Sequence, residues 1–413
     1  MKMRIALITE TYASNMGYLE NCLSKYLARL GAEVHIMTMD LLPYYQLNEL
    51  RGVFEGFANR MDDHCFQKSI NGCTIHVLPH KRQLGYMRMV GLVDRLRHIQ
   101  PDIVQITSAI GWIPLDSALA KLSIKFKLFT GNHNTASTFP LACLKPRFWD
   151  MQMIRFFLTR TIHGRLVSTM TEKCYAVTVD CADIAVNFYG VQKKKVEVMH
   201  LGVDRDFFFP VSSDNDLAER EKVRKYLGVR PSDIVCIYTG KLTAVKNAVI
   251  LAQAIARLRS KGLPFCGLFI GEGIQSNDIQ SYANCTVLPF MPYWELAPYY
   301  RASDIGVWPT NESTSMLDAA ACGIPLIVSD GIVYREHIDG NGLIYKMNDL
   351  DNLIATLLKL RDPLERERLG SYGAKKMAEK FGWDLVARRR LKDYVAAVRT
   401  SIGDSSSLHG YAK

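Results

Sequence analysis

The residues best suited to chemistry in this chain lie where a short apolar run gives way to a helical pattern. Ile305 to Trp308 predicts a buried strand, and an Ala-rich helical pattern follows it and ends near Gly323. Ser313, Thr314 and Ser315 lie between the two, at the predicted N-terminus of the helix. Backbone N–H groups at such an end lack partners within the helix, and the helix dipole favours negative charge there. The stretch therefore predicts a phosphate-binding site.

Two carboxylates flank this stretch, because Glu312 precedes it and Asp318 follows it. Carboxylates repel a phosphate, so they suit such a site only if they accept hydrogen bonds from the hydroxyl groups of a sugar or ribose. A capped helix with one solvated aspartate explains the same residues without any ligand. These residues alone leave both interpretations open.

A second candidate follows another predicted strand, Ile234 to Tyr238. Gly240 and Lys241 come directly after this strand, and Lys246 stands five residues later, before a predicted helix that runs to Leu258. Two cations in a strand-to-helix loop can clamp a diphosphate and neutralise charge on a departing one. Taken alone, two ordinary surface lysines are the simpler interpretation.

A third candidate is His133, which follows a predicted strand at Phe126 to Thr130. Open α/β sheets bind their ligands at the carboxyl ends of the strands, which makes a histidine there a candidate site residue. A single loop histidine is more often structural, so this residue needs a second argument.

The elements that must position these residues alternate between strand and helix. Further strands are predicted at 4–9, 33–38, 73–78, 101–106 and 173–179, with a helix between the first two and a basic helix at 87–98. The strand–loop–helix–strand order is a βαβ unit, so the fold class is α/β with doubly wound parallel sheets. There is no G-x-G-x-x-G, so Gly17 in the first loop does not indicate a dinucleotide cofactor.

Composition places this chain of 413 residues, 48% hydrophobic and 22% charged, among globular proteins long enough for two domains. No apolar run reaches the roughly 20 residues that span a bilayer, and the first one is too short for a signal peptide. The ten cysteines are scattered without Cys-x-x-Cys pairs, which indicates reduced core residues and a cytoplasmic protein.

Basic charge is concentrated in the first half of the chain. Residues 1–205 hold 25 Lys and Arg against 17 Asp and Glu, which accounts for +8 of the net +10. Such a half suits an anionic membrane surface, a lipid diphosphate or nucleic acid. Residues 145–167 interleave Arg with bulky apolar residues. They predict either a peripheral membrane interface or a helix whose Arg stems cover the sheet edge.

Two acidic clusters could suggest a metal site. In Asp62-Asp63-His64-Cys65 the consecutive side chains cannot easily turn onto one ion, and no second ligand pair stands at a suitable spacing. The other cluster is Asp204-Arg205-Asp206, and its interpretation depends on the wider pattern of motifs described next.

From about Lys2 to Val398, the order of these motifs resembles the retaining glycosyltransferases of GT-B fold known as family 4, group 1. The resemblance implies two Rossmann-like domains that face a cleft. Asp318 matches the class's second acid, which holds ribose, and Glu312 matches the first at a shorter spacing than usual. Ser-Thr-Ser replaces the usual glycine-rich turn between them.

The resemblance also implies roles for the remaining candidates. Lys241 and Lys246 match the diphosphate clamp, with Lys241 in place of the usual Arg, and His133 matches a histidine beside the donor sugar. Donor-side positions are Gly17, Gly240, Gly271 and Met291, and acceptor-side positions are Tyr18, Glu20, Asn21 and Asn132.

The domain plan implied by the resemblance is an acceptor-binding domain at 1–205, a donor-binding domain at 206–382 and a helix at 383–399 that returns to the first. The polar run 212–221 is expected to be linker, and 400–413 a disordered tail. Asp204-Arg205-Asp206 matches the interdomain signature, so neither a metal nor another cofactor is expected.

The implied function is metal-independent transfer of a sugar, with retention, from a nucleoside-diphosphate-sugar to an acceptor hydroxyl. The expected acceptor is a sugar or a lipid-linked intermediate of the cell envelope, and the protein is expected in the cytoplasm or on the inner face of the membrane. A nucleotide-sugar-binding protein without turnover, or an epimerase or phosphorylase of the same fold, is an alternative. A nucleic-acid-binding protein is a weaker alternative, and no nucleic-acid partner is expected, because no aromatic platform or helix-turn-helix pattern accompanies the basic charge.

Overall fold

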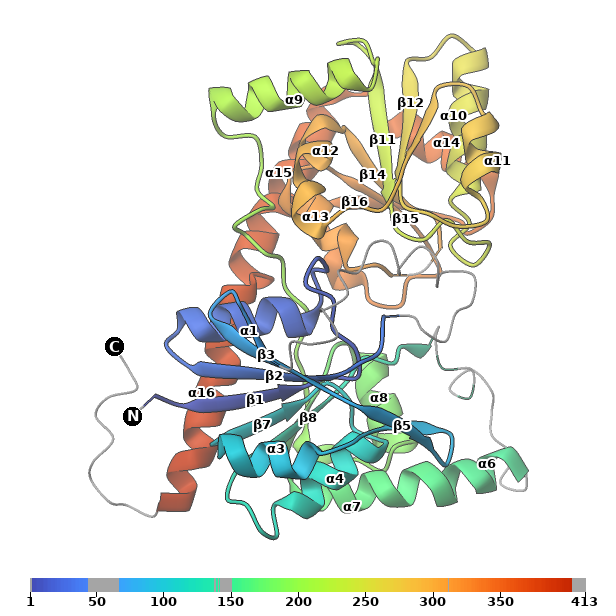
Figure 1. Cartoon of the computed structure of the whole chain (residues 1–413). Helices are drawn as coiled ribbons and strands as arrows, with labels where there is room; N and C mark the ends of the chain where they lie inside the picture. The colour runs from blue at the N-terminus through green and yellow to red at the C-terminus, as the bar shows by residue number, and fades with distance from the viewer. Residues whose placement is uncertain are drawn as a thin grey trace.

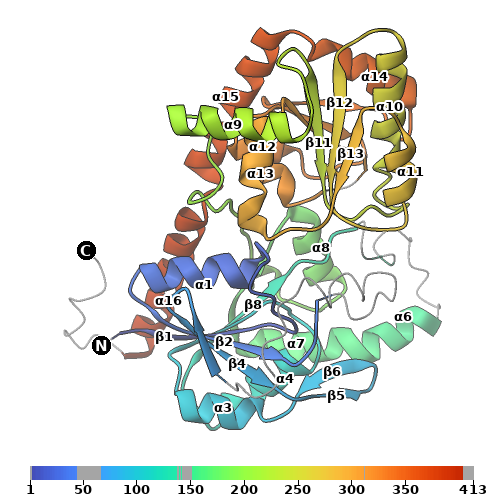
Figure 2. The ribbon, with the colours of Figure 1, turned by 45° about the horizontal axis from the view of Figure 1, so that its top comes forward.

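The computed structural model describes residues 2–43, 67–136, 139, 141, 151–310 and 312–402. Two α/β domains lie one above the other, each built on its own largely parallel sheet (Figures 1 and 2). The predicted cluster Asp62-Asp63-His64-Cys65 lies outside the described residues, as do residues 145–150 and 403–413.

The first domain is built on eight strands in the order β10-β9-β8-β7-β1-β2-β4-β3. All neighbouring pairs are parallel except β3 with β4, and a separate hairpin pairs β5 with β6. The strands are β1 (Arg4–Ile8), β2 (Glu33–Met39), β3 (Gln67–Ile70), β4 (Cys73–Leu78), β5 (His80–Gln83), β6 (Tyr86–Met89), β7 (Ile103–Ile106), β8 (Lys127–Asn132), β9 (Thr171–Ala176) and β10 (Val196–Val198).

Helices cover both faces of this sheet, which explains why its central strands are apolar throughout. In β1, Ile5 and Leu7 join one core cluster, while Ala6 and Ile8 join another on the opposite face. The helical segments of this domain are α1 (Leu19–Arg29), α3 (Leu92–Ile99), α4 (Trp112–Ala120), α6 (Met151–Phe156), the π-helical η2 (Phe157–Thr161), α7 (Ile162–Met170), α8 (Val179–Asn187) and η3 (Lys193–Lys195).

The second domain has six parallel strands in the order β13-β12-β11-β14-β15-β16, around one continuous core. They are β11 (Ile234–Thr239), β12 (Phe265–Ile270), β13 (Cys285–Leu288), β14 (Ile305–Trp308), β15 (Leu326–Ser329) and β16 (Gly342–Tyr345). The helical segments are α9 (Asp214–Tyr226), α10 (Val249–Ser260), α11 (Ser276–Ser281), η4 (Tyr293–Glu295), α12 (Ala297–Ala302), α13 (Ser315–Ala321), η5 (Arg335–His337), α14 (Leu350–Lys359) and α15 (Pro363–Lys380).

The last helix, α16 (Trp383–Ile402), leaves the second domain and packs on the first (Figures 1 and 2). Trp383, Ala387 and Tyr394 are buried in the core that α1 also covers. Where the chain crosses, Trp383 N donates to Val203 O at 3.1 Å. A Cβ on Gly202 would lie 2.8 Å from Trp383 N, so the two crossing segments touch through their backbones.

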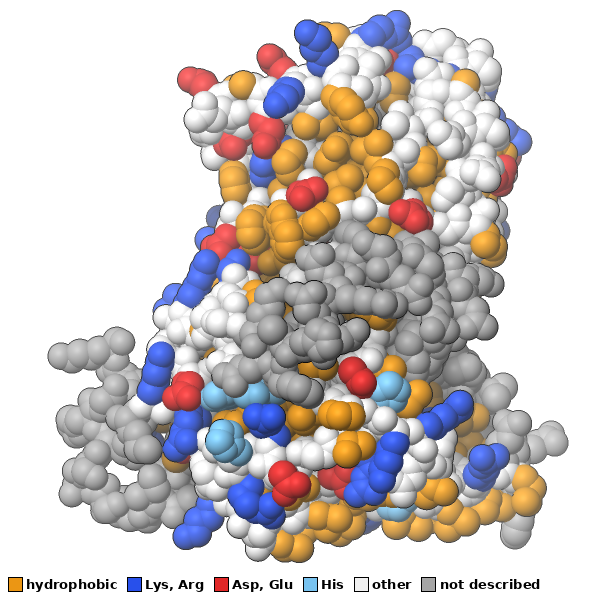
Figure 3. Space-filling view, viewed as in Figure 1, with side chains coloured by type: hydrophobic (Ala, Val, Ile, Leu, Met, Phe, Trp, Pro, Cys, Tyr) orange, Lys and Arg blue, Asp and Glu red, His pale blue; other side chains and the backbone are white. Residues whose placement is uncertain are grey.

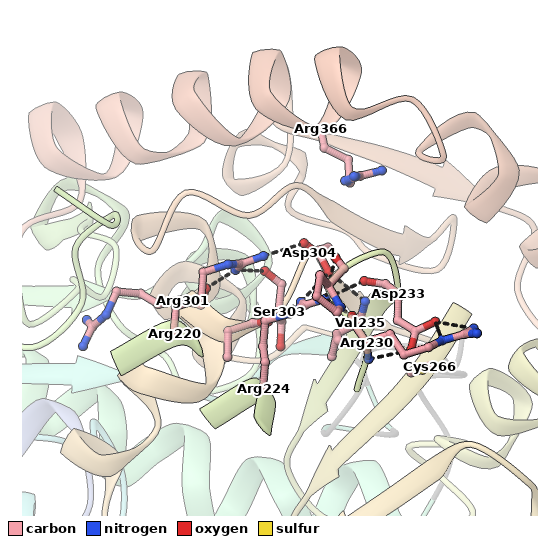
Figure 4. A network of polar contacts seen from close by, with 12 residues as sticks. Arg220, Arg224, Arg230, Asp233, Val235, Cys266, Arg301, Ser303, Asp304 and Arg366 are labelled. Carbon is pink, nitrogen blue, oxygen red and sulfur yellow. Dashed lines mark hydrogen bonds and ion pairs between the residues drawn. The ribbon is translucent and has the colours of Figure 1, made fainter. Parts of the chain in front are cut away.

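Two local predictions were wrong. The polar run expected to be linker begins α9, where Ser213 and Asp216 form a capping box. Arg220 and Arg224 then reach the carboxylate of Asp304 at 2.8 and 3.1 Å, so tertiary ion pairs hold a helix of low hydrophobicity (Figure 4). The basic helix expected at 87–98 begins only at Leu92, because the preceding residues pair with β5 as strand β6.

A buried carboxylate joins the domains at the crossing. Asp204 Oδ2 accepts from Lys25 Nζ at 2.7 Å and from the hydroxyl of Tyr293, in the second domain, at 3.0 Å. Its other oxygen accepts from Tyr26 OH at 2.8 Å, and Lys25 also pairs with Asp206 at 2.6 Å. Both acids of the Asp204-Arg205-Asp206 cluster are thus engaged by side chains of α1.

We predict that Asp204→Asn lowers the free energy of unfolding by about 3 kcal/mol, because the amide turns a donor toward groups that already donate and leaves a buried ammonium undercompensated. Asp206→Asn is the matched control. The Asp206 side chain is 35% exposed, so its loss should cost about 1 kcal/mol or less. Urea unfolding followed by circular dichroism measures both, and equal losses would contradict the special role of Asp204.

Candidate functional site

A cavity of about 560 Å³ lies between the two domains. On the first domain it is lined by residues that follow β1, β7 and β8, namely Glu10, Thr107 and His133. These are carboxyl ends of parallel strands, where doubly wound sheets bind their ligands. From the second domain, Tyr293, Thr314 and Asp318 complete the lining, so both domains contribute to one site.

The two predicted lysines lie in the loop after β11, and both are half-buried. Burial lowers the pKa of Lys241 to about 8, and the charge of Lys246 adds to this effect. Burial also lowers the pKa of Lys246, while the charge of Glu312 opposes that change. Two cations that destabilise each other in a partly dehydrated loop are stabilised by an anion that contacts both.

Glycines hold this lysine loop against the loop after β12. A Cβ on Gly271, at φ +150°, would lie 1.9 Å from Gly240 O, and one on Gly273, at φ +154°, would lie 2.3 Å from Leu242 O. Gly240 N donates to Ile270 O at 3.0 Å across the same contact. The described contacts of Gly271 therefore position the lysine loop, and the predicted donor contact of Gly271 stays a prediction.

The Ser-Thr-Ser stretch lies at the cleft, as a strand-to-helix junction should. Strand β14 has the predicted bounds, and α13 begins at Ser315 with no side-chain cap from Thr314. Ser313 Oγ and Ser315 Oγ are 2.6 Å apart and contact each other, whereas Thr314 is exposed and lines the cavity. The alternative that explains these residues without a ligand requires a Ser or Thr hydroxyl that caps the helix. Thr314, at the N-cap of α13, makes no such side-chain hydrogen bond.

The two acids near this stretch have different surroundings. Glu312 Oε1 accepts from the backbone N–H of Val333 at 2.6 Å and of Tyr334 at 3.4 Å, so this carboxylate holds the loop after β15. Asp318 lines the cavity instead, and burial together with the nearby Asp204 raises its pKa well above the usual range. Of the two, only Asp318 lies where it can contact a ligand in this cavity.

His133 and Asn132 both line the cavity, but their side chains have different contacts. His133 is exposed to the cavity, and its setting deep in the cleft with Arg390 nearby lowers its pKa to about 4, so it is neutral at pH 7. Asn132 is buried, donates to Cys181 O at 2.8 Å and accepts from Asn134 N at 3.2 Å. Asn132 therefore positions the loop that carries His133.

The first loop lies against the second domain. A Cβ on Gly17 would lie 2.9 Å from Cδ2 of Tyr293, so glycine permits this close approach. Tyr18 and Glu20 line the cavity, and burial raises the pKa of Glu20 to about 7. Asn21, in the first turn of α1, donates from Nδ2 to Ala13 O of the first loop at 2.9 Å.

Sequence reasoning missed much of the first domain's lining. Glu10 carried a usable signal, because it comes two residues after β1 at the carboxyl edge of the sheet. The aromatic and basic residues of the lining carried no such sequence signal. They come from distant positions in the chain, and hairpin β5–β6, α4 and η2 bring them together. The missed residues are Tyr86, Trp112, Phe139, Arg160, Tyr189 and, from the second domain, Tyr293. Met291 packs against the core of the second domain, and its predicted contact with a base stays a prediction.

Family comparison agrees with this architecture. Residues 22–207 match the family model described as Glycosyltransferase Family 4, and residues 233–362 match the one described as Glycosyl transferases group 1. The two matches cover most of the first sheet and all of the second. The chain belongs to the family 4, group 1 class of glycosyltransferases, as its motifs predicted.

Solved structures confirm the predicted GT-B fold. A sucrose-phosphate synthase from Thermosynechococcus elongatus superposes with a TM-score of 0.68 at 15% identity, covering 97% of this chain and 100% of that one. HepE of Anabaena, solved in complex with UDP-glucose, superposes with a TM-score of 0.65 at 14% identity, over 96% of this chain and all of that one.

Among curated proteins, the D-inositol 3-phosphate glycosyltransferase of Streptomyces bingchenggensis is 28% identical over 262 residues. The match covers 58% of this chain and 56% of that relative, so the chain spans little more than half of the relative's length.

The lowered pKa of Lys241 makes a prediction about pH. If UDP, GDP or ADP binds at the lysine loop, its affinity should fall about tenfold between pH 7 and pH 9. Over this range Lys241 loses its proton, because its pKa is about 8. The terminal phosphate of the nucleotide, with a pKa of about 6, stays charged throughout. In Lys241→Arg the guanidinium keeps its charge, so the fall should shrink to about twofold. Titration calorimetry at both pH values measures this, and equal pH profiles for the two proteins would contradict it.

Proposed function

We propose that this protein transfers a sugar from a nucleoside-diphosphate-sugar to an acceptor hydroxyl, with retention at the anomeric carbon and without a metal. The observation that carries the proposal is the pair of half-buried lysines with lowered pKa values, in a GT-B domain that faces a second domain across a cleft. The structure of HepE with UDP-glucose supports a nucleotide-sugar donor for this fold.

In the proposed reaction, a bond forms between the acceptor oxygen and the anomeric carbon as the bond from that carbon to the diphosphate oxygen breaks. Lys241 and Lys246 neutralise the charge that grows on the departing diphosphate, which takes the acceptor's proton on the same face of the sugar. Asp318 accepts from ribose hydroxyls, and neutral His133 hydrogen-bonds a hydroxyl of the donor sugar. Glu312 shapes the loop beside the sugar through Val333 and Tyr334.

The proposal that no metal is needed rests on Asp204 and Asp206, the two carboxylates whose spacing could suggest a metal site. Asp204 and Asp206 are both paired with Lys25, and Asp204 also accepts from two tyrosines. In the proposed mechanism the two lysines of the second domain supply the positive charge that a divalent ion would bring to the diphosphate.

We further propose that the first domain contacts an anionic membrane surface through α6, η2 and α7. Large apolar side chains along this segment are between 40% and 77% exposed, and Figure 3 shows apolar side chains along the edge where α6 and α7 run. Exposed Arg155, His163 and Arg165 accompany them, a combination that suits an interface rich in anionic lipid. The apolar residues are Met151, Ile154, Phe157, Leu158, Ile162 and Leu166. Among the described residues, no helix is both long and apolar enough to cross a bilayer.

The proposed function is tested with a panel of UDP-, GDP- and ADP-sugars in the presence of EDTA. We expect saturable binding of one nucleotide and slow release of its diphosphate with water as acceptor, because the lysines stabilise the leaving group in either case. Binding without any release, even with candidate acceptors, would favour a nucleotide-sugar-binding protein. If no nucleotide bound at millimolar concentration, the proposal would be wrong.

The membrane proposal predicts that the double variant I154E/L158E binds phosphatidylglycerol vesicles at least tenfold more weakly in a cosedimentation assay. The variant places two carboxylates among the exposed apolar side chains of α6 and η2. The matched control is L217E/L364E, which changes two exposed leucines of the second domain, on α9 and α15. Vesicle binding that stays equal in both variants would contradict the proposal.

A further inference from the structure

Tyr334 links the loop after β15 to the first domain. Its hydroxyl lies 2.7 Å from Nε2 of His200, which follows β10. The other ring nitrogen of His200, Nδ1, lies 2.9 Å from the carbonyl oxygen of Val177. A carbonyl oxygen can only accept, so Nδ1 carries the proton. Burial lowers the pKa of His200, so the ring is neutral at pH 7 and Nε2 accepts from the hydroxyl of Tyr334.

Within the second domain, Tyr334 is held by residues of the proposed donor side. The carboxylate of Glu312 accepts from the backbone N–H of Tyr334 at 3.4 Å. The carbonyl oxygen of Glu312 accepts from Lys246 Nζ, also at 3.4 Å. Lys376 Nζ holds the other end of the same loop through Asp339 O at 2.9 Å. The Tyr334 hydroxyl therefore extends toward the first domain from a loop that is fixed beside the lysine loop.

Within the first domain, the contact at His200 continues to the loop that carries His133. Val177 follows β9, and its backbone N–H donates to Asn132 O at 3.1 Å. The side-chain oxygen of Asn132 accepts from Asn134 N at 3.2 Å. One series of hydrogen bonds thus joins the His133 loop to Tyr334 and, through Tyr334, to Glu312.

Ring packing fixes the orientation of the two side chains. The ring centres of His200 and Tyr334 are 4.5 Å apart, and His337 lies 4.6 Å from Tyr334. Phe381, where the chain crosses between the domains, packs on His337 at 5.0 Å. These rings partly shield the hydroxyl–imidazole contact from water, which strengthens a hydrogen bond between neutral partners.

Glu336 is a second partner for the Tyr334 hydroxyl. Its carboxylate contacts this hydroxyl and lies 3.6 Å from His200 Nε2. One hydroxyl proton cannot serve both acceptors. The Glu336 side chain is 48% exposed, so water can solvate its carboxylate, whereas the His200 side chain is 24% exposed. The less solvated acceptor gains more from the proton, which favours the bond from Tyr334 to His200.

We infer that Tyr334 and His200 are positioning residues for sugar transfer, because their contact fixes the Glu312-bound loop of the second domain relative to the His133 loop of the first. The inference rests on the proposed function, in which the lysines hold the diphosphate and His133 contacts the sugar of the same donor. A donor held from both domains reacts well only when the two loops are correctly placed. Binding of the nucleotide part needs the second domain alone.

The kinetic test compares Y334F with the wild type in the slow hydrolysis of the nucleotide-sugar that the protein binds. We expect kcat to fall about tenfold, because one hydrogen bond between the loops is lost while the ring packing stays. KM and the affinity for the free nucleoside diphosphate should stay within about twofold. Y226F is the matched control, since Tyr226 is 71% exposed on α9. Equal losses in Y334F and Y226F, or a loss of affinity alone, would overturn the inference.

Two further variants test which contact acts. The double variant H200L/Y334F should be no slower than the slower single variant, because both changes remove the same interaction. E336Q should keep kcat within about twofold, since its amide can donate to the Tyr334 oxygen and leave the hydroxyl proton to His200. Losses that multiply in the double variant, or a loss in E336Q equal to that in Y334F, would overturn the inference in favour of independent effects or an ion pair.

Amide hydrogen exchange tests the same contact without turnover. In Y334F the amides of Val177 and Asn134, both in the first domain, should exchange at least tenfold faster, because the bond that holds His200 from the second domain is gone. Unchanged amides of β11 show that the variant is folded. Equal exchange of Val177 and Asn134 in the variant and the wild type would overturn the inference. Failure of the proposed function would instead appear as absent nucleotide binding in the wild type, and the exchange comparison would still test the contact.

Discussion

The arrangement of the two domains depends on one buried carboxylate at the point where the chain crosses between them. Asp204 binds a lysine and a tyrosine of α1 and the hydroxyl of Tyr293 from the second domain. An uncompensated carboxylate at 2% exposure would be very costly, so all three donors must stay in place together. Since Tyr293 also touches Gly17 and lines the cavity, this interaction links the relative position of the domains to the shape of the cleft.

Electrostatics divides the cleft into two sides. The second domain carries two lysines, of which Lys246 lowers the pKa of Lys241, whereas the first presents one arginine among tyrosines. The lysine loop of the second domain suits a phosphate group. Asp318, Glu20 and Glu10 line the cavity between the two sides, and burial raises the pKa of all three carboxyls. Such carboxyls suit hydroxyl-rich ligands better than cations.

Several predicted site residues act on their neighbours in this structure. Asn132 holds the His133 loop, Gly271 makes room for the lysine loop, and Glu312 binds two backbone N–H groups. Motif spacing places a residue near a site but does not say whether its side chain faces the ligand or the supporting loop. That distinction depends on side-chain direction, which residues from other elements decide.

The sequence by itself determined the fold class, the positions of most strands and the family, because buried parallel strands are continuous apolar runs and their strand-to-loop junctions follow locally. It also placed Lys241, Thr314, Asp318 and His133 at the edges where ligands bind. Only the tertiary structure decided that α9 is a helix, since its stability comes from ion pairs to Asp304, about 80 residues away. Only the tertiary structure brought Tyr86, Arg160 and Tyr189 to one wall, because no local pattern encodes contacts between a hairpin, a π-helical turn and the end of α8.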